Sequence, residues 1–168
     1  MNRKSNQLVT QLAELVQEKR LKVCTAESCT GGLIAKSLTD LAGSSDWFER
    51  GFVTYSNQSK CEMIEVPESV IIEYGAVSEP VANAMARGAL RNSAADVSIA
   101  VTGVAGPAGG TEEKPVGTVW IAVASEKQLV AKKYWFDGDR EAIRIETMQT
   151  AIEMLLQLLE SVESIKPS

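Results

Sequence analysis

Hydrophobic residues recur at helical spacing along residues 6–19, 33–41 and 140–159, and each stretch predicts an amphipathic helix that packs one face on a core. Start and stop signals predict two further helices. Pro67 lies at the start of a short one that Gly75 ends, and Ser78 is placed to cap one that runs over residues 81–90. The short helix is expected to turn three residues toward the core, Val70, Ile71 and Ile72.

Runs rich in β-branched and apolar residues predict five strands, over residues 21–26, 51–55, 96–101, 116–124 and 129–136. Four residues separate the last two strands, a spacing suited to a hairpin. A hairpin makes its two strands antiparallel, whereas alternating strands and helices favour parallel pairing. The sequence therefore predicts an α/β fold, a three-layer α/β/α sandwich with a mixed, mostly parallel central sheet.

The composition is that of one ordinary domain. The chain has 168 residues, 45% of them hydrophobic, so we expect a single domain over residues 1–168 with a frayed tail at 161–168. No apolar run could span a bilayer and no signal sequence precedes the first helix, which predicts a cytoplasmic protein without a membrane partner. A net charge of −5 disfavours a nucleic-acid partner, and three cysteines without CxxC spacing fit a reducing compartment.

The chain contains no histidine. This absence excludes Ser-His-Asp and Cys-His catalysis and every histidine-ligated metal site. A base that activates a nucleophile must then be Lys, Asp, Glu or Tyr. We expect no metal and no cofactor.

Residues 25–32, TAESCTGG, lie where the first sheet strand leads into a helix. The first N–H groups of a helix have no intrahelical partner, so they could hold an anion or an oxyanion beside Ser28 as a nucleophile. Thr30 and Gly31 would then lie against the substrate, since glycine lets backbone approach a ligand closely. The alternative is that Ser28 or Thr30 only caps the helix.

Polar residues also follow two other predicted strands, and the carboxyl ends of strands are where ligands collect in α/β sheets. Lys60 lies just beyond the strand at 51–55 and is a candidate base for Ser28, provided that desolvation lowers its pKa; the alternative is an ordinary surface lysine. Tyr55 could relay a proton. Cys29 is a competing nucleophile, but it lacks an imidazole partner.

The third strand end runs into a glycine-rich loop, residues 103–110, that begins after Thr102. Gly103 and Gly106 could let its backbone cradle a phosphate, although the loop lacks the Gly-Lys-Ser/Thr ending of a nucleotide P-loop. Arg140 follows a glycine turn at the start of the last helix. It could clamp a phosphate, or it could be an ordinary first-turn charge.

Five blocks of sequence together resemble the CinA C-terminal domain family, whose stand-alone members include nicotinamide-nucleotide amidase. They are residues 25–32 (TAESCTGG), 53–57 (VTYSN) with Lys60, 75–78 (GAVS), 102–107 (TGVAGP) and 114–119 (KPVGTV), and the resemblance runs from about residue 8 to residue 159. It implies hydrolysis of the carboxamide of nicotinamide mononucleotide to nicotinate mononucleotide and ammonia, in pyridine nucleotide salvage.

The resemblance also implies residue roles. Ser28 would be the nucleophile, Lys60 the general base and Tyr55 a hydroxyl that assists proton transfer, while Thr102 and Arg140 match positions linked to activity or substrate binding. Two alternatives remain: a catalytically silent paralogue, and a nucleotide-binding or interaction module linked to competence or DNA-damage response. A small-molecule nucleotide is the expected partner, and pairing into a homo-oligomer is possible.

Overall fold

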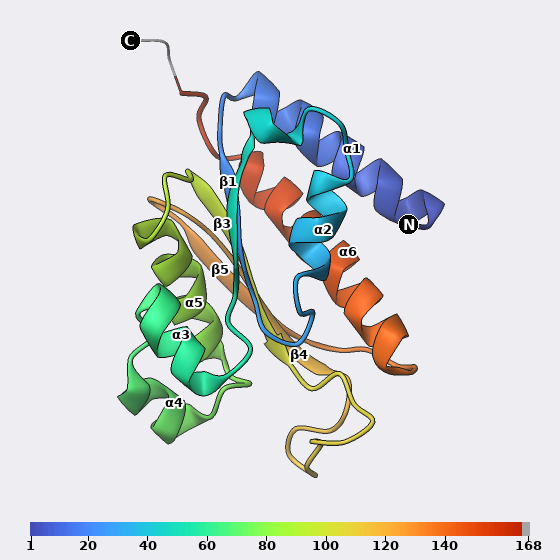
Figure 1. Ribbon diagram of the computed structural model, residues 1–168, viewed down its shortest axis with the longest axis vertical. Coiled ribbons are helices and arrows are strands. Elements are labelled where there is room, and N and C mark those ends of the chain that lie inside the picture. Colours follow the sequence, from blue (N-terminus) through green and yellow to red (C-terminus); the bar gives the residue numbers. More distant parts are fainter. Residues whose placement is uncertain (166–168) are drawn as a thin grey trace.

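The computed structural model describes residues 1–165, in which helices cover both faces of a five-stranded sheet (Figure 1). The strand order is β2-β1-β3-β4-β5, with β1 parallel to both its neighbours and β4 antiparallel to both of its own. The strands are β1 (Val23–Glu27), β2 (Phe48–Val53), β3 (Val97–Gly103), β4 (Thr118–Ser125) and β5 (Leu129–Trp135). The predicted three-layer α/β/α fold with a mixed sheet is confirmed.

Two hydrophobic cores lie on opposite faces of the sheet. On one face pack α1 (Arg3–Glu18), α2 (Leu33–Thr39) and α6 (Arg140–Leu159), with the one-turn helix η1 (Ser44–Asp46) before β2. On the other face lie α3 (Asn57–Ile64), α4 (Glu68–Tyr74) and α5 (Glu79–Arg91) (Figure 1). Side chains that alternate along the strands supply both cores.

The two faces of the sheet differ in the size of their side chains. Val97, Ile99 and Val101 of β3 enter the core under α1 and α6, whereas Ala100 enters the core under α5. The buried face of α5 is also made of small residues, Ala82, Ala86, Gly88 and Ala89, and it packs on the strand alanines Ala26, Ala100, Ala122 and Ala124. Ser78 caps the helix as predicted, accepting from the N–H of Val81. Small residues on both surfaces allow α5 to lie close to the sheet.

The largest local difference from the sequence prediction is α3. The sequence analysis predicted no helix here and placed Lys60 just beyond the strand at 51–55, but Lys60 lies on this helix, whose buried residues are Lys60 and Ile64. In α4 the prediction was right for Ile71, which is buried, and wrong for Ile72, which is 78% exposed. A short helix buries one narrow face, so its adjacent apolar positions cannot all reach the core.

The predicted frayed tail begins as an ordered segment. The Ile165 N–H donates to the Lys19 carbonyl over 2.9 Å, and the Ser161 hydroxyl bonds to the Gln128 side chain. Residues 166–168 lie outside the described part of the chain.

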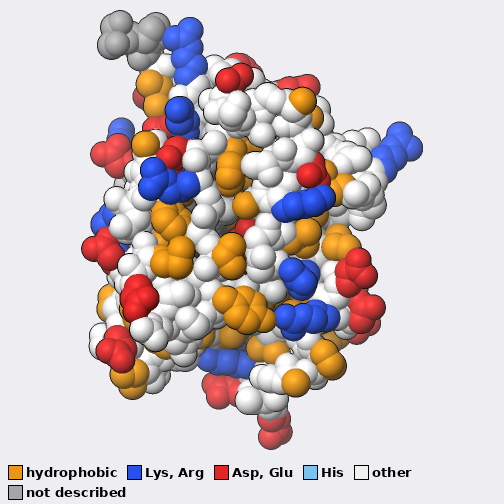
Figure 2. All heavy atoms as spheres, in the orientation of Figure 1, with side chains coloured by type: hydrophobic (Ala, Val, Ile, Leu, Met, Phe, Trp, Pro, Cys, Tyr) orange, Lys and Arg blue, Asp and Glu red, His pale blue; other side chains and the backbone are white. Residues whose placement is uncertain are grey.

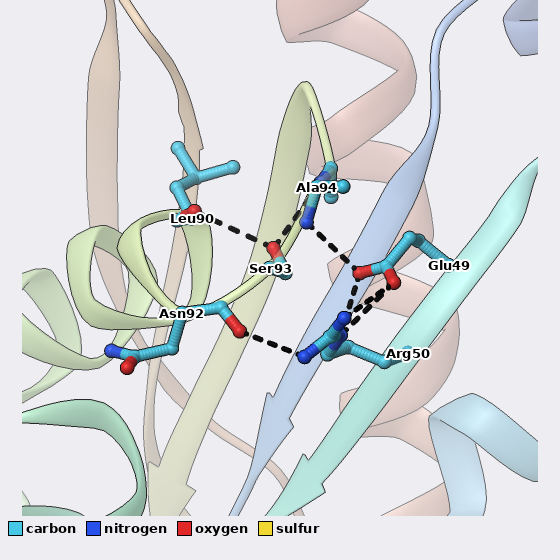
Figure 3. A network of polar contacts seen from close by, with 7 residues as sticks. Glu49, Arg50, Leu90, Asn92, Ser93 and Ala94 are labelled. Atoms are coloured by element: carbon cyan, nitrogen blue, oxygen red, sulfur yellow. Dashed lines mark hydrogen bonds and ion pairs between the residues drawn. The ribbon is translucent and has the colours of Figure 1, made fainter.

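A polar network joins the edge strand β2 to the connection between α5 and β3 (Figure 3). It lies at the amino-terminal ends of β2 and β3. The Arg50 guanidinium donates to the Asn92 carbonyl over 3.1 Å, and the Glu49 carboxylate accepts from the Ala94 N–H over 3.2 Å. Arg50 also bonds to Glu49, which lowers the pKa of that carboxyl. The network lies at the end of the sheet opposite the carboxyl termini of the parallel strands.

Charged side chains of both signs are spread over the surface (Figure 2). Among residues 1–165, no helix is both long and apolar enough to cross a membrane.

The close approach of α3 to α5 depends on Gly88. A Cβ at this position would overlap the backbone carbonyl of Ile64, the last residue of α3. We predict that Gly88→Ala lowers the free energy of unfolding by about 1–3 kcal/mol, the usual range for overpacking. A Gly→Ala change inside a helix without such an overlap stabilises the protein by up to about 1 kcal/mol. A loss of stability would therefore indicate the overlap with Ile64.

Urea denaturation measures this difference. Arg91→Ala, at an exposed position of the same helix, should change the free energy of unfolding by less than about 0.5 kcal/mol. A stabilised Gly88→Ala protein would show that α3 does not contact α5 at this point.

Candidate active site

Ser28 lies directly after β1, in a turn held by the neighbouring strand. Its N–H donates to the Val101 carbonyl of β3 over 3.1 Å, and its own carbonyl accepts from the Gly31 N–H over 3.0 Å. Gly31 and Gly32 have φ angles of 60° and 103°, in the left-handed region that side chains disfavour. The two glycines of the sequence motif are therefore required by the turn itself. Ser28 is 9% exposed.

The carboxylate of Glu27 holds the turn from inside. It accepts from the Thr30 hydroxyl (2.7 Å) and from the N–H groups of Ile34 (2.8 Å) and Ala35 (3.0 Å). Glu27 is 1% exposed, so the start of α2 compensates a buried negative charge. Sequence analysis gave Glu27 no role, although an acidic residue just before a helix start is a recognisable signal.

This arrangement corrects one expectation. The helix begins at Leu33, as its hydrophobic pattern predicts, but the Glu27 carboxylate accepts from the N–H groups at its start that we expected to bind an anion or oxyanion. The N–H groups that remain lie earlier, in the turn. Those of Cys29 and Thr30 donate to no backbone or side-chain oxygen within residues 1–165.

Lys60 reaches the nucleophile turn from α3. Ser56 begins this helix by accepting from the Ser59 N–H over 3.0 Å, a capping signal that is readable in the sequence. The Lys60 side chain then runs back toward the sheet, and its Nζ lies 3.0 Å from Ser28 Oγ. Nζ also donates to the carbonyl of Thr54 over 2.9 Å and contacts that of Tyr55 at 3.3 Å.

The surroundings of Lys60 favour a neutral amine. The residue is 1% exposed, and burial lowers the pKa of its ammonium, against a smaller opposing effect of the Cys29 and Cys61 thiols. Within the described chain, no carboxylate forms an ion pair with it. A neutral amine has two N–H donors and one lone pair, which match two carbonyl oxygens and one hydroxyl hydrogen.

Cys29 is unsuited to the role of nucleophile. Burial raises the pKa of its thiol to about 12, so the reactive thiolate is scarce at neutral pH. Its side chain belongs to the core under α1 and α6. The alternative that the sequence left open at this position is therefore disfavoured.

Tyr55 and Arg140 meet at the rim of the site. The Tyr55 hydroxyl accepts from Arg140 Nη2 over 3.0 Å, while Nη1 of the same guanidinium donates to the Gly106 carbonyl over 2.8 Å. Tyr55 is 58% exposed, and within residues 1–165 no hydrogen bond joins its hydroxyl to Ser28 or Lys60. The backbone carbonyl of Tyr55 therefore lies at the predicted Ser28–Lys60 pair, whereas its hydroxyl does not.

Three other predicted site residues serve local packing. The Thr102 hydroxyl is buried and donates to the Ala76 carbonyl over 2.8 Å, which fastens β3 to the loop before α5. A side chain at Gly103 would press on the Thr118 carbonyl, and one at Gly106 would overlap Val116. These contacts explain the two glycines without a ligand. No cluster of three or more metal-ligating side chains occurs within residues 1–165.

Comparison with known proteins finds relatives over most of the chain. The CinA C-terminal domain family matches residues 5–159. Nicotinamide-nucleotide amidohydrolase PncC of Escherichia coli (strain K12) is 50% identical over 152 residues, which cover 90% of this chain and 92% of that protein. A CinA-like protein of Geobacter sulfurreducens is 50% identical over 154 residues, 92% of this chain and 37% of that longer protein.

The fold agrees as well. The crystal structure of competence/damage inducible protein CihA from Agrobacterium tumefaciens has a TM-score of 0.90 and 43% identity, with coverage of 94% of this chain and 97% of that one. Sequence and structure thus match over nearly the whole chain, including the turn that carries Ser28 and the helix that carries Lys60. The chain belongs to the CinA C-terminal domain family.

Proposed function

We propose that this protein is a nicotinamide-nucleotide amidohydrolase that cleaves the carboxamide of nicotinamide mononucleotide with Ser28 as nucleophile and Lys60 as general base. The observation that carries the proposal is the 3.0 Å contact between Ser28 Oγ and a buried, uncompensated Lys60 Nζ. Relatives about 50% identical over most of both chains and named nicotinamide-nucleotide amidohydrolase support the choice of substrate.

The first step forms an acyl-enzyme. Neutral Lys60 takes the Ser28 hydroxyl proton while Oγ attacks the carboxamide carbon, which leaves a negative charge on the former carbonyl oxygen. Donors for this oxyanion must come from the turn, because Glu27 occupies the helix start. The N–H groups of Cys29 and Thr30, which donate to no oxygen within residues 1–165, are next to Ser28 in the chain, and such donors stabilise the charge as it develops.

The second step releases the product. The Lys60 ammonium gives its proton to the departing nitrogen, so that ammonia leaves and an ester to Ser28 remains. Lys60, neutral again, takes a proton from a water molecule that attacks this ester. As the ester bond breaks, Lys60 returns this proton to Ser28 Oγ. The products are nicotinate mononucleotide and a free Ser28 hydroxyl, in keeping with a role in pyridine nucleotide salvage.

The rim offers hydrogen-bond donors for the substrate phosphate. The Arg140 guanidinium has five N–H donors, of which the structure uses one on Tyr55 and one on Gly106. The remaining donors can bind phosphate oxygens together with backbone of the loop at residues 103–110. Arginine suits this task because its planar fork matches phosphate geometry.

The nucleophile assignment predicts that Ser28→Ala lowers the rate of ammonia release from nicotinamide mononucleotide by about 10³-fold or more, as removal of a catalytic nucleophile usually does. Thermal denaturation should show a folded protein. Cys29→Ala is the matched control at the next residue and should keep most of the activity, because the Cys29 thiol is buried and protonated. An active Ser28→Ala protein, or a folded but inactive Cys29→Ala protein, would contradict the assignment.

The base assignment predicts a pH profile. Only neutral Lys60 can accept a proton, so kcat/KM should rise with pH through the lowered pKa of Lys60, below its ordinary value of 10.5. Lys60→Arg should be inactive across the profile, because arginine does not lose its proton in this range. Lys60→Met removes both the amine and its charge and should be inactive as well. A wild-type rate that falls from neutral to alkaline pH, with the protein still folded, would rule out Lys60 as base.

The rim geometry predicts that Tyr55 and Arg140 act on substrate binding. Arg140→Gln should raise KM for nicotinamide mononucleotide by about 10-fold or more, the loss expected for a charge-assisted hydrogen bond, with a smaller change in kcat. Tyr55→Phe should behave likewise to a lesser degree. Steady-state kinetics separates the two quantities. If Tyr55→Phe instead lowers kcat by about 100-fold at unchanged KM, its hydroxyl transfers a proton in the reaction.

A further inference from the structure

The turn that carries Ser28 is held from outside by one side chain of α6, that of Arg144. Helices α2 and α6 lie on the same face of the sheet (Figure 1), and Nη2 of Arg144 donates to the Thr30 carbonyl over 2.6 Å. The same carbonyl accepts from the Leu33 N–H over 3.1 Å. The bond from Arg144 joins residues 114 positions apart, so the local sequence of the turn does not produce it.

Two peptide groups connect Arg144 with the N–H of the residue after the nucleophile. In a trans peptide the C=O and the N–H point in opposite directions. Arg144 donates to the C=O of the peptide between Thr30 and Gly31. The N–H of this peptide donates to the Ser28 carbonyl over 3.0 Å. That carbonyl belongs to the peptide between Ser28 and Cys29, so the Cys29 N–H points away from the Gly31 N–H and out of the turn.

The Cys29 N–H is the better fixed of the two N–H groups available to the oxyanion. The Thr30 N–H shares its peptide with the Cys29 carbonyl, which accepts no backbone hydrogen bond within residues 1–165. In nucleophile turns between a strand and a helix, the N–H of the residue after the nucleophile is a recurring oxyanion donor. Both observations favour Cys29 as the main donor.

Arg144 also polarises this chain of hydrogen bonds, because its guanidinium is not neutralised. It forms no ion pair in the described part of the chain, although Glu141 lies one turn earlier on the same helix. A charged donor at the head of such a chain strengthens the later bonds, and here the last donor is the Cys29 N–H. Burial raises the pKa of the Cys29 thiol to about 12 and Glu27 adds to the rise, whereas Arg144 acts against it. The guanidinium thus offsets the buried carboxylate at this residue.

We propose that Arg144 is a positioning residue for amide cleavage, which fixes and polarises the Cys29 N–H as the main donor to the oxyanion. The proposal rests on the amidohydrolase function of Ser28 and Lys60, and it gives Arg144 no contact with the substrate. The Cys29 N–H meets the negative charge that forms when Ser28 Oγ attacks, and the charge returns to the carbonyl when ammonia leaves. An interaction that grows only as the oxyanion forms acts on kcat and leaves substrate binding unchanged.

Steady-state kinetics of ammonia release from nicotinamide mononucleotide tests this role. Arg144→Gln shortens the side chain and removes its charge, and it should lower kcat by about 10-fold or more at unchanged KM, as expected for a lost charge-assisted hydrogen bond. Arg144→Lys keeps a charged donor and should lose less. Lys36→Gln is the matched control, because it removes an exposed cation from α2 and should leave kcat as in the wild type.

Two further measurements separate this role from a purely structural one. Arg144→Gln should be folded in thermal denaturation and should bind nicotinate mononucleotide as tightly as the wild type does. In the ¹⁵N-labelled protein, the Cys29 amide signal should shift in Arg144→Gln and return toward the wild-type position in Arg144→Lys. Lys36→Gln should leave this signal in place.

Three results would overturn the proposal. One is equal kcat in the wild type and Arg144→Gln, and another is a loss of activity that appears as a raised KM, because Arg144 would then bind the substrate. The third is an unshifted Cys29 signal in Arg144→Gln. Arg144→Met, which fills the same half-buried space, gives the same tests if Arg144→Gln does not fold. If the wild type releases no ammonia, the proposed function fails and the catalytic role falls with it, while the Cys29 signal still decides whether Arg144 acts on the turn.

Discussion

A lysine amine buried without a negative partner is the constraint on which the site depends. Removal of an ammonium from water is expensive, and a protein usually offsets this cost with a carboxylate or by releasing the proton. Here Lys60 has two backbone carbonyls and the Ser28 hydroxyl around it, and within residues 1–165 no carboxylate forms an ion pair with it. These partners suit a neutral amine. The strand end at Thr54, the cap of α3 at Ser56 and the close packing of α3 on α5 all serve to keep the amine in this place.

Glu27 is an acidic residue of the turn whose carboxylate does not pair with the Lys60 amine. Glu27 is adjacent to Ser28 in sequence, and a carboxylate near Nζ would stabilise the ammonium and raise the pKa of Lys60. Its oxygens instead accept from the Thr30 hydroxyl and the start of α2. The helix dipole and three hydrogen bonds compensate the buried charge, so the acid shapes the turn without pairing with the base. The cost is that the helix start is closed to an oxyanion.

The site also divides into a rigid floor and an exposed rim. Ser28, Lys60 and Thr102 are buried and held by backbone groups of two or more elements. Tyr55 and Arg140 are exposed and held mainly by each other. Chemistry at the floor needs fixed distances, whereas a nucleotide needs an opening through which to enter and leave. Arg144 of α6 donates to the Thr30 carbonyl over 2.6 Å and so ties this helix to the turn that carries Ser28.

The sequence by itself determined the layers of the fold, the Ser78 cap and the bounds of α6, because hydrophobic periodicity and capping are local signals. It also singled out Ser28 and Lys60, through their places beyond predicted strand ends in a chain without histidine and through a resemblance between motifs. Only the tertiary structure decided that Lys60 lies on a helix, since the buried face of α3 consists of a lysine and one isoleucine and shows no apolar stripe. The role of Glu27 likewise depends on the turn, which needs two glycines with left-handed backbone angles. The hydrogen bond between Tyr55 and Arg140 joins residues that are 85 positions apart in the sequence. Such contacts leave no periodic trace in the chain, because they are set by packing in space.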